Sequence, residues 1–204
     1  MTSLDNEQLD ALSEVFNIGV GKAAAALSTL IHDEVLLAVP QVSVVTVSEA
    51  VQHLGATGLR EMYGVRQPFA GVINGDALLI FPSEQSLELV RIAAGGAATA
   101  ATLDTVAHDA MAEIGNLMLN ACIASLGDLL GEHFEIGTPR VDSGDGRALL
   151  STRVQNHMVV FLHIRFELKS SPIVGYVVFV LHTPSLSTLK TSIDALLGRP
   201  AHAA

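Results

Sequence analysis

Two stretches of the chain repeat one spacing of acidic, amide and proline residues that could hold a reacting group. The first set is Asp10, Glu14, Asn17 and Pro40, and the second is Asp109, Glu113, Asn116 and Pro139. Each member of the second set follows its counterpart by 99 positions. The spacing therefore predicts two related sites.

The asparagines limit the chemistry that such a site can perform. An amide has no useful proton affinity near neutral pH, so Asn17 and Asn116 cannot act as general bases. An amide does donate and accept hydrogen bonds at once, which suits it to hold one water in a fixed orientation. An aimed water is sufficient when the electrophile is already reactive, as a phosphoryl group on a carboxylate is, because phosphoryl transfer depends mainly on positioning and charge stabilisation.

The glutamate of each set lies one turn before the asparagine and could pair with a lysine of a phosphorylated partner. Such a pair would fix the register in which the partner docks. Neither residue type makes a self-contained active site. The partner would have to bring the phosphate, its metal ion and the cation.

Two long helices are predicted to present these residues. Residues 5–31 are expected to be helical, with Asp5 as the N-cap and Gln8 three residues later. Successive residues of a helix are rotated by about 100°. One side of this helix therefore carries four residues that fall within about 60° of one another around the axis, namely Asp10, Glu14, Asn17 and Gly21. The second helix, about 104–130, repeats this stripe as Asp109, Glu113, Asn116 and Asn120.

A glutamate and an asparagine three residues apart usually mark an ordinary solvated helix face, and two observations favour a site instead. Asparagine is a poor helix former. The motif residues also agree in both stretches, whereas neighbours such as Phe16 and Gly115 differ. Gly19 and Gly21 indicate a close approach of either the sister helix or a docked partner, because glycine inside a helix is otherwise costly.

An internal repeat organises the whole chain. Over residues 10–42, the offset of 99 gives nine identities in 33 positions. We therefore predict one domain, 1–204, made of two repeats of about 1–98 and 99–204, with a small-residue linker at 93–101. The expected fold class is α/β (α+β), with pseudo-two-fold symmetry and one continuous antiparallel sheet that removes the inner edges of both repeats.

The shorter elements are predicted from local signals. Strands are expected at 63–73 and 76–82 around a type I′ turn at Asn74-Gly75. A further buried strand is expected at Ile173–Leu181. Helices are expected to open at Pro82-Ser83 and at Pro184-Ser185.

Composition excludes several classes of protein. The chain has 204 residues, is 50% apolar and carries a formal net charge of −10 without any tryptophan, which argues against a nucleic-acid-binding surface. No uninterrupted apolar run reaches the roughly 18 residues of a membrane span, and the N-terminus lacks a signal-peptide pattern. A single cysteine excludes an intrachain disulfide. We expect a cytoplasmic protein without membrane insertion.

Competing sites have little support in the sequence. The histidines never form a helical HxxxH pair, and no glycine loop of the phosphate-binding type occurs. Cys122 lies near apolar Leu126 and is typical of a core residue. No metal site of the chain's own is predicted.

The pattern Asp-x₃-Glu-x₂-Asn-x₂₂-Pro, present twice without departure, resembles the signature of the CheC, CheX and FliY phosphatases of bacterial and archaeal chemotaxis. The resemblance extends over nearly the whole chain, through the two motifs, the duplicated layout and the length. CheX proteins usually keep one motif in a shorter chain. FliY proteins carry a further flagellar-switch domain. The residues after about residue 198 are too few to form that domain, so the CheC branch fits best.

The resemblance implies a protein aspartyl-phosphate phosphatase, a hydrolase that acts on the phosphorylated response regulator CheY in two-component signalling. Glu14 and Glu113 would bridge to the lysine of the receiver domain. Asn17 and Asn116 would orient the attacking water.

For the other motif residues the resemblance implies supporting roles, with Asp10 and Asp109 assisting and Pro40 and Pro139 ending a loop before a strand. The chain would have no cofactor of its own, because the Mg²⁺ belongs to the receiver domain. The receptor deamidase CheD would be a second partner. The alternative is a non-catalytic module that sequesters a receiver domain or regulates CheD through the same residues.

Overall fold

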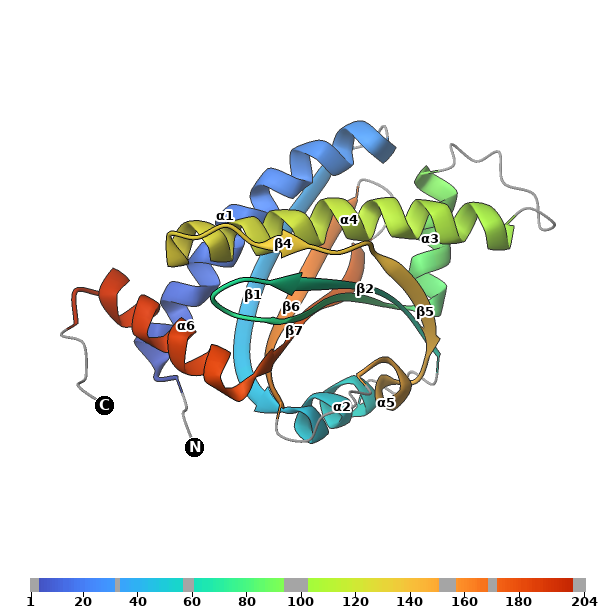
Figure 1. Ribbon diagram of the computed structural model, residues 1–204. Coiled ribbons are helices and arrows are strands. Elements are labelled where there is room, and N and C mark those ends of the chain that lie inside the picture. The colour runs from blue at the N-terminus through green and yellow to red at the C-terminus, as the bar shows by residue number, and fades with distance from the viewer. Residues whose placement is uncertain are drawn as a thin grey trace.

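The computed structural model describes residues 4–31, 34–56, 61–93, 103–150, 157–168 and 172–199 (Figure 1). Its helices and strands are, in chain order, α1 (Asn6–Ile31), β1 (Val35–Thr46), α2 (Val47–Ala56), β2 (Met62–Ala70), β3 (Gly75–Pro82), α3 (Ser83–Ala93), α4 (Leu103–Leu130), β4 (Glu135–Ile136), β5 (Arg140–Gly144), α5 (Gly146–Leu149), β6 (His157–Leu168), β7 (Pro172–His182) and α6 (Thr183–Leu196).

All of these strands join one antiparallel sheet, as predicted. The strand order is β1-β6-β7-β3-β2-β4, and β5 pairs with β2 beside β4. Strands from the two predicted repeats are interleaved, because β6 and β7 lie between β1 and β3. The inner edges of both halves are therefore paired.

The order of elements is the same in both halves of the chain. The first half runs α1-β1-α2-β2-β3-α3, and the second runs α4-β4/β5-α5-β6-β7-α6. Exchanging equivalent strands reverses the sheet order, which is what a two-fold axis between β7 and β3 would produce. This layout agrees with the pseudo-two-fold arrangement that the sequence predicts. Helices α2 and α5 and strands β1, β4, β5 and β6 are additional to the elements predicted by residue range.

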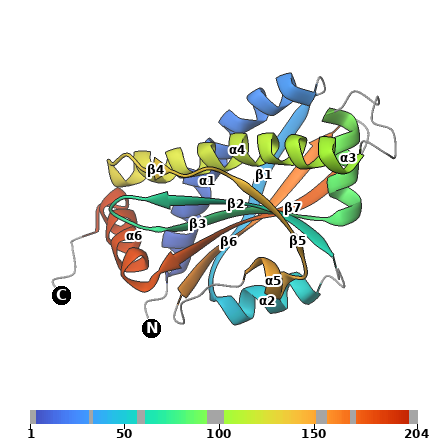
Figure 2. The same ribbon diagram turned by 45° about the vertical axis from the view of Figure 1, so that its right-hand side comes forward.

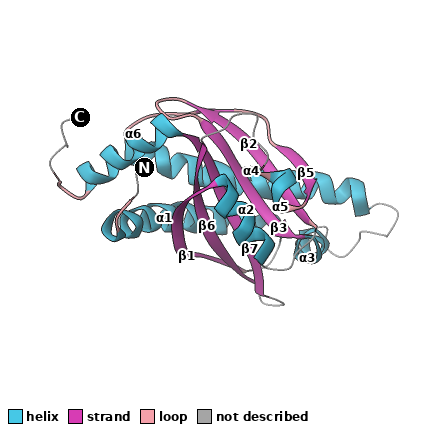
Figure 3. Ribbon diagram, turned by 90° about the horizontal axis from the view of Figure 1, so that it is seen from below, coloured by secondary structure: helices cyan, strands magenta, loops and turns pink. Residues whose placement is uncertain are grey.

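The sheet has a core on each face. Helices α1 and α4 cover one face, and α3 and α6 pack at the ends of this layer (Figures 1 and 2). Phe16 of α1 stacks on Phe179 of β7 there, with ring centroids 5.2 Å apart. On the other face, α2 and α5 cover a smaller core that includes Phe161 and Tyr176 (Figure 3). Both motif helices thus lie on the same face of the sheet.

The start of α1 is fixed by the predicted capping box. The backbone N–H of Gln8 donates to Asp5 Oδ1, and the backbone N–H of Asp5 donates to Gln8 Oε1, both at 2.9 Å. On the face of this helix that packs on the sheet, buried apolar residues recur at helical spacing, namely Leu12, Phe16, Ala23 and Leu27. The helix that carries the first motif therefore forms where the sequence predicts it.

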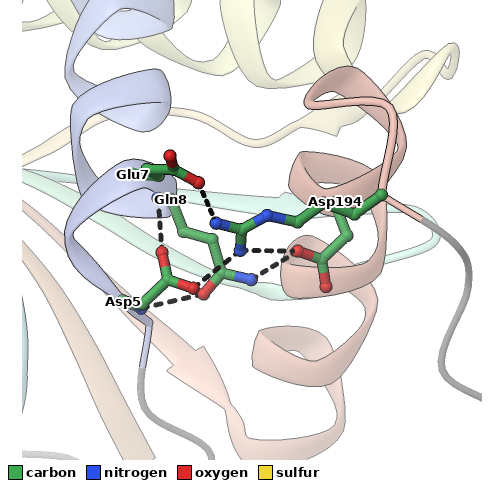
Figure 4. Close-up of polar contacts among 5 residues, drawn as sticks. Asp5, Glu7, Gln8 and Asp194 are labelled. Atoms are coloured by element: carbon green, nitrogen blue, oxygen red, sulfur yellow. Dashed lines mark hydrogen bonds and ion pairs between the residues drawn. The ribbon is translucent and has the colours of Figure 1, made fainter.

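A polar cluster joins the start of α1 to the end of α6 (Figure 4). Gln8 Nε2 donates to Asp194 Oδ1 at 2.6 Å, and both side chains are buried. Arg199 pairs with Asp5 at 2.6 Å and also with Glu7. The guanidinium of Arg199 lowers the pKa of Asp5, and the Gln8 backbone N–H lowers it further. The two ends of the described chain are held together by this cluster.

The two motif helices cross at Gly19. A Cβ at that position would lie 2.9 Å from the carbonyl oxygen of Ala121 in α4, so glycine is required for the contact. A Cβ at Gly21 would meet nothing within 4 Å. The neighbour that approaches Gly19 is therefore the sister helix α4, and no residue of the chain lies close to Gly21 in the structure as described.

Two local predictions differ from the structure or lie outside it. The type I′ turn at Asn74-Gly75 is wrong, since β2 ends at Ala70 and Gly75 begins β3 without a positive φ. Asn74 instead holds the loop, accepting from the Gly71 N–H at 3.3 Å and donating its own N–H to Ser185 Oγ at 3.1 Å. The predicted linker 93–101 lies, beyond Ala93, outside the described residues.

Among the described residues, two helices are long and apolar enough to span a membrane by length and composition alone, namely α1 and the His108–Leu130 part of α4. In their most apolar 18-residue stretches, 33% of the α1 residues and 56% of the α4 residues are buried. Both helices pack on the sheet, so core packing accounts for their apolar residues.

Candidate functional site

The motif residues have the same exposure in both helices. Asp10 and Glu14 are exposed and Asn17 is half-buried on α1. The α4 residues repeat this arrangement, with exposed carboxylates and a half-buried amide at Asp109, Glu113 and Asn116. Each helix thus presents an accessible glutamate one turn before a partly sheltered asparagine.

Asn17 is bonded to the backbone of the edge strand β1. Its Oδ1 accepts from the Val39 N–H at 2.9 Å, and its Nδ2 donates to the Val39 carbonyl at 3.4 Å. The Ser13 hydroxyl donates to the same carbonyl at 3.2 Å. The contacts hold the Asn17 amide beside an irregularity of the strand, where the pairing of β1 with β6 shifts between Ala38 and Gln41.

The motif prolines lie where strand pairing is interrupted. Pro139 directly precedes β5, which fits the expectation that it ends a loop before a strand. Pro40 instead lies within β1, at the shift in register, so that expectation is wrong for the first set. The physical reason is the same at both positions, because proline has no N–H to contribute to a ladder of hydrogen bonds.

Asn116 is bonded to side chains rather than to a strand backbone. Its Oδ1 accepts from Asn120 Nδ2 at 3.0 Å and from Gln67 Nε2 at 3.2 Å. Gln67 comes from β2, and α4 lies close to this strand because a Cβ at Gly115 would be 2.5 Å from Val65 Cγ1. The second site therefore contains an amide network that the first site lacks.

Gln67 is the centre of this network. Its side chain is 2% exposed, and its Nε2 lies 3.2 Å from three acceptors, Asn116 Oδ1, Asn120 Oδ1 and the Gly137 carbonyl. All three neighbours are oxygens, so the amide must point its NH₂ toward them. Gln67 Oε1 is consequently buried without a hydrogen-bond partner among the described residues. An unpaired buried polar group costs about 1–3 kcal/mol, so the network forms at the expense of stability.

The two sets of motif residues form separate sites. Asn17 contacts β1 at one edge of the sheet, and Asn116 contacts β2, next to the β4/β5 edge. The glutamate and asparagine of each set come from one helix, so neither site needs a residue from the other.

The surroundings of the first site offer a docking surface. A groove of about 350 Å³ runs between α1 and β1 and is lined by Asn6, Leu9, Asp10, Ser13, Gln41 and Val42. Ile18, which follows Asn17, is 53% exposed, whereas its counterpart Leu117 is partly buried against the core. An exposed large apolar side chain beside a polar motif is suited to contact with a protein partner.

The other candidate groups lie in the fold as core or surface residues. Cys122 is completely buried, and burial raises the pKa of its thiol to about 12, so it is not a nucleophile at neutral pH. Within the described segments, no group of three or more His, Cys, Asp or Glu side chains is arranged to hold a metal ion.

Gln67 is the site residue that the sequence did not single out. It lies in the strand segment Val65–Phe69 without any spacing relation to the motif. Asn120, in contrast, falls on the predicted stripe, at the position equivalent to Gly21.

Two family models match the chain, and each includes one copy of the motif. The model described as the CheC-like family matches residues 7–44, which include Asp10–Pro40. The model described as chemotaxis phosphatase CheX matches residues 63–163, which include Asp109–Pro139.

Curated relatives match most of the chain at low identity. The putative CheY-P phosphatase CheC1 of Halobacterium salinarum is 24% identical over 151 residues, which cover 74% of this chain and 76% of that protein. The CheY-P phosphatase CheC of Bacillus subtilis is 24% identical over 166 residues, which cover 77% of this chain and 79% of that protein.

Solved structures share the fold over almost the full length. FliY of Thermotoga maritima superposes with a TM-score of 0.76 at 19% identity, covering 95% of this chain and 99% of that one. FliM in the FliM–SpeE complex of H. pylori gives a TM-score of 0.70 at 10% identity, covering 94% and 97%. At these identities the likeness establishes the fold, and a fold alone does not specify an activity.

Proposed function

Because the chain is a CheC-type chemotaxis protein, of the group that also includes CheX and FliY, we propose that it hydrolyses the aspartyl phosphate of a CheY-type response regulator. The observation that carries the proposal is the exposed glutamate with a half-buried asparagine one turn later, in the same register on two helices. The names of the two curated relatives, both CheY-P phosphatases, support the same substrate.

In the proposed reaction, water attacks phosphorus while the bond from phosphorus to the receiver's aspartate breaks. The aspartate leaves as a carboxylate. The water oxygen stays on phosphorus with one of its hydrogens, and the second proton passes to another phosphate oxygen or to solvent. Asn17 or Asn116 contributes by orienting that water, because positioning is the main need of a phosphoryl group that is already activated. The Mg²⁺ that neutralises phosphate charge is expected on the receiver domain.

Glu14 and Glu113 are proposed to dock the partner. Each is exposed and reaches solvent without a basic side chain bonded to it among the described residues. A lysine of the receiver domain can therefore pair with either glutamate, and such a charge-assisted contact fixes the docking register.

A non-catalytic receiver-binding module is the second candidate. It is favoured by the hydrogen bonds that both asparagine side chains make within the chain, since these bonds would explain the two residues without any catalytic role. Docking and catalysis use the same glutamates, so a binding measurement alone does not separate the two candidates.

The double variant Asn17→Ala with Asn116→Ala tests the proposal. We expect the purified protein to accelerate phosphate release from a phosphorylated chemotaxis receiver, and the double variant to lose at least tenfold of that acceleration while it still binds. Loss of an oriented hydrogen-bonding group in a transition state costs about this much or more. Release of phosphate and binding of the receiver are measured separately.

A matched control is Gln52→Ala, which removes an exposed amide from α2 on the opposite face of the sheet. Its rate should equal that of the natural protein. A double asparagine variant with an undiminished rate contradicts the water-positioning role. Binding by the natural protein without any acceleration supports the binding module instead.

Two further expectations belong to the same proposal. The deamidase CheD is expected as a second partner, which a binding measurement between the two purified proteins would test. The protein is expected to act in the cytoplasm, where phosphorylated response regulators are found.

A further inference from the structure

The two sites differ at the position one turn after the motif asparagine, which is Gly21 in the first set and Asn120 in the second. Asn120 Nδ2 donates to Asn116 Oδ1 at 3.0 Å, and Gln67 Nε2 approaches the same oxygen at 3.2 Å. An amide oxygen has two lone pairs. Asn116 Oδ1 therefore lies within hydrogen-bond distance of two donors of the chain itself. The contact from Asn120 is the shorter one, because the two N–H groups of Gln67 Nε2 are shared among three acceptors.

The amide oxygen of Asn17 is engaged only once. It accepts from the Val39 N–H at 2.9 Å and has no second donor among the residues that the structure describes. Gly21 has no side chain to supply one, and a Cβ at this position would meet nothing within 4 Å. One lone pair of Asn17 Oδ1 is free to bind a water.

A free acceptor matters for the proposed reaction. The attacking water uses an oxygen lone pair against phosphorus, so its hydrogens must point away, toward acceptors that hold the water in line. The amide oxygen of the motif asparagine is such an acceptor. When both of its lone pairs are engaged, a hydrogen bond inside the chain must break before the water can be held.

We propose that Asn120 is a positioning residue that restrains the second site by occupying the amide oxygen of Asn116. The first site then carries most of the turnover. This inference rests on the proposed phosphatase function. It adds to that function which of the two sites has the higher turnover and which residue lowers the turnover of the other.

The test isolates the second site by placing Asn120→Ala in an Asn17→Ala background. We expect kcat for receiver dephosphorylation to rise about three- to tenfold over Asn17→Ala alone, with KM unchanged, because one hydrogen bond of ordinary strength is removed from the acceptor. The side-chain amide signals of Asn116 in ¹⁵N NMR spectra should shift in the same variant. A purely structural role of Asn120 would lower stability without raising kcat.

The reverse substitution tests the same idea at the first site. Gly21→Asn in an Asn116→Ala background places a second donor one turn after Asn17, and the open surroundings of Gly21 can accept it. We expect kcat to fall about three- to tenfold. Gln52→Ala in each background is the matched control and should leave kcat unchanged.

The outcomes separate this inference from the proposed function. If the natural protein does not accelerate dephosphorylation, both are wrong. If it does, but Asn120→Ala leaves kcat of the second site equal or lower, the restraint by Asn120 is overturned and the proposed function stands. An unchanged first site in the Gly21→Asn variant would also overturn the restraint.

Discussion

Two histidines lie in an aromatic cluster on the face of the sheet opposite the motif helices. The ring of His163 lies 5.0 Å from that of Tyr176 and 5.6 Å from that of Phe161, measured between centroids. The ring of His53 of α2 meets that of Phe161 edge-on, with centroids 5.8 Å apart. Burial lowers the pKa of His163 from its ordinary value of 6.5, and the neighbouring His53 lowers it further.

This pKa predicts a loss of stability in mild acid. The unfolded chain binds a proton at His163 more readily than the folded chain, so the free energy of unfolding decreases as pH falls below about 6.5. We expect His163→Phe, which keeps a ring against Tyr176 and Phe161, to have a smaller decrease in melting temperature between about pH 7.5 and pH 5.5. Thermal unfolding followed by circular dichroism at both pH values measures the difference.

The control is Gln52→Ala, which truncates an exposed, uncharged side chain of α2 on the same face of the sheet. It should keep the pH dependence of the natural protein. If the melting temperature of His163→Phe depends on pH as that of the natural protein does, protonation of His163 does not contribute to the loss of stability in mild acid.

At the scale of single residues, the sequence could indicate the motif but not the hydrogen bonds that surround it. Glu14 and Asn17 follow from helical spacing, because residues three apart share a helix face. Gln67 reaches Asn116 only because Gly115 lets α4 approach β2, a tertiary contact that no local spacing encodes. The difference between Gly21 and Asn120 is visible in the sequence, but the contact of Gln67 with Asn116 became visible only in the structure.

Among the elements, the long helices were predictable because periodicity and capping agree with their packing. The Asn74-Gly75 turn was wrong for a physical reason, since contacts with α6 hold Asn74 in a longer loop and override its local turn preference. From the sequence, Pro40 is expected to end a loop before a strand, whereas β1 continues through Pro40, because a strand at the edge of a sheet tolerates a residue without an N–H.

The crossing of α1 and α4 predicts opposite effects for two neighbouring glycines. Gly19→Ala forces a Cβ against the backbone carbonyl of Ala121, and we expect a net loss of about 1–2 kcal/mol in the free energy of unfolding. Gly21→Ala meets no neighbour and should gain about 0.5–1 kcal/mol, because alanine is the better helix former. Urea unfolding of the two variants gives both values.

The pair serves as its own control, because both changes add one methyl group to α1 only two positions apart. Equal effects of the two substitutions would mean that the helices adjust at no cost, and the close contact at Gly19 would then not be required for the packing of the motif helices.

For the whole molecule, contacts between distant parts of the chain decide the arrangement. The polar cluster of Figure 4 joins Gln8 to Asp194 and Asp5 to Arg199. The capping box of Asp5 and Gln8 could be predicted from their spacing, but their partners near the other end of the chain could not. The interleaved sheet was predictable in outline, because two related halves with exposed edges gain by sharing them.

The interleaving predicts that neither half folds alone. In a fragment of residues 1–98, β1 would lack its neighbour β6, and β3 would lack β7. A fragment of residues 99–204 would leave β5 without β2. We expect each fragment to unfold without a cooperative transition, and an equimolar mixture to recover one, because only the mixture can pair every inner strand and cover both faces of the sheet.

Size-exclusion chromatography and thermal unfolding of the separate and mixed fragments measure this outcome. The control is fragment 1–98 alone at the total protein concentration of the mixture, because this sample lacks β6 and β7. Cooperative unfolding of either fragment alone would mean that each half has a sufficient core. The two sites could then be studied on separate halves, whereas an obligatory pairing means that they can be compared only in the intact chain, where every inner strand is paired.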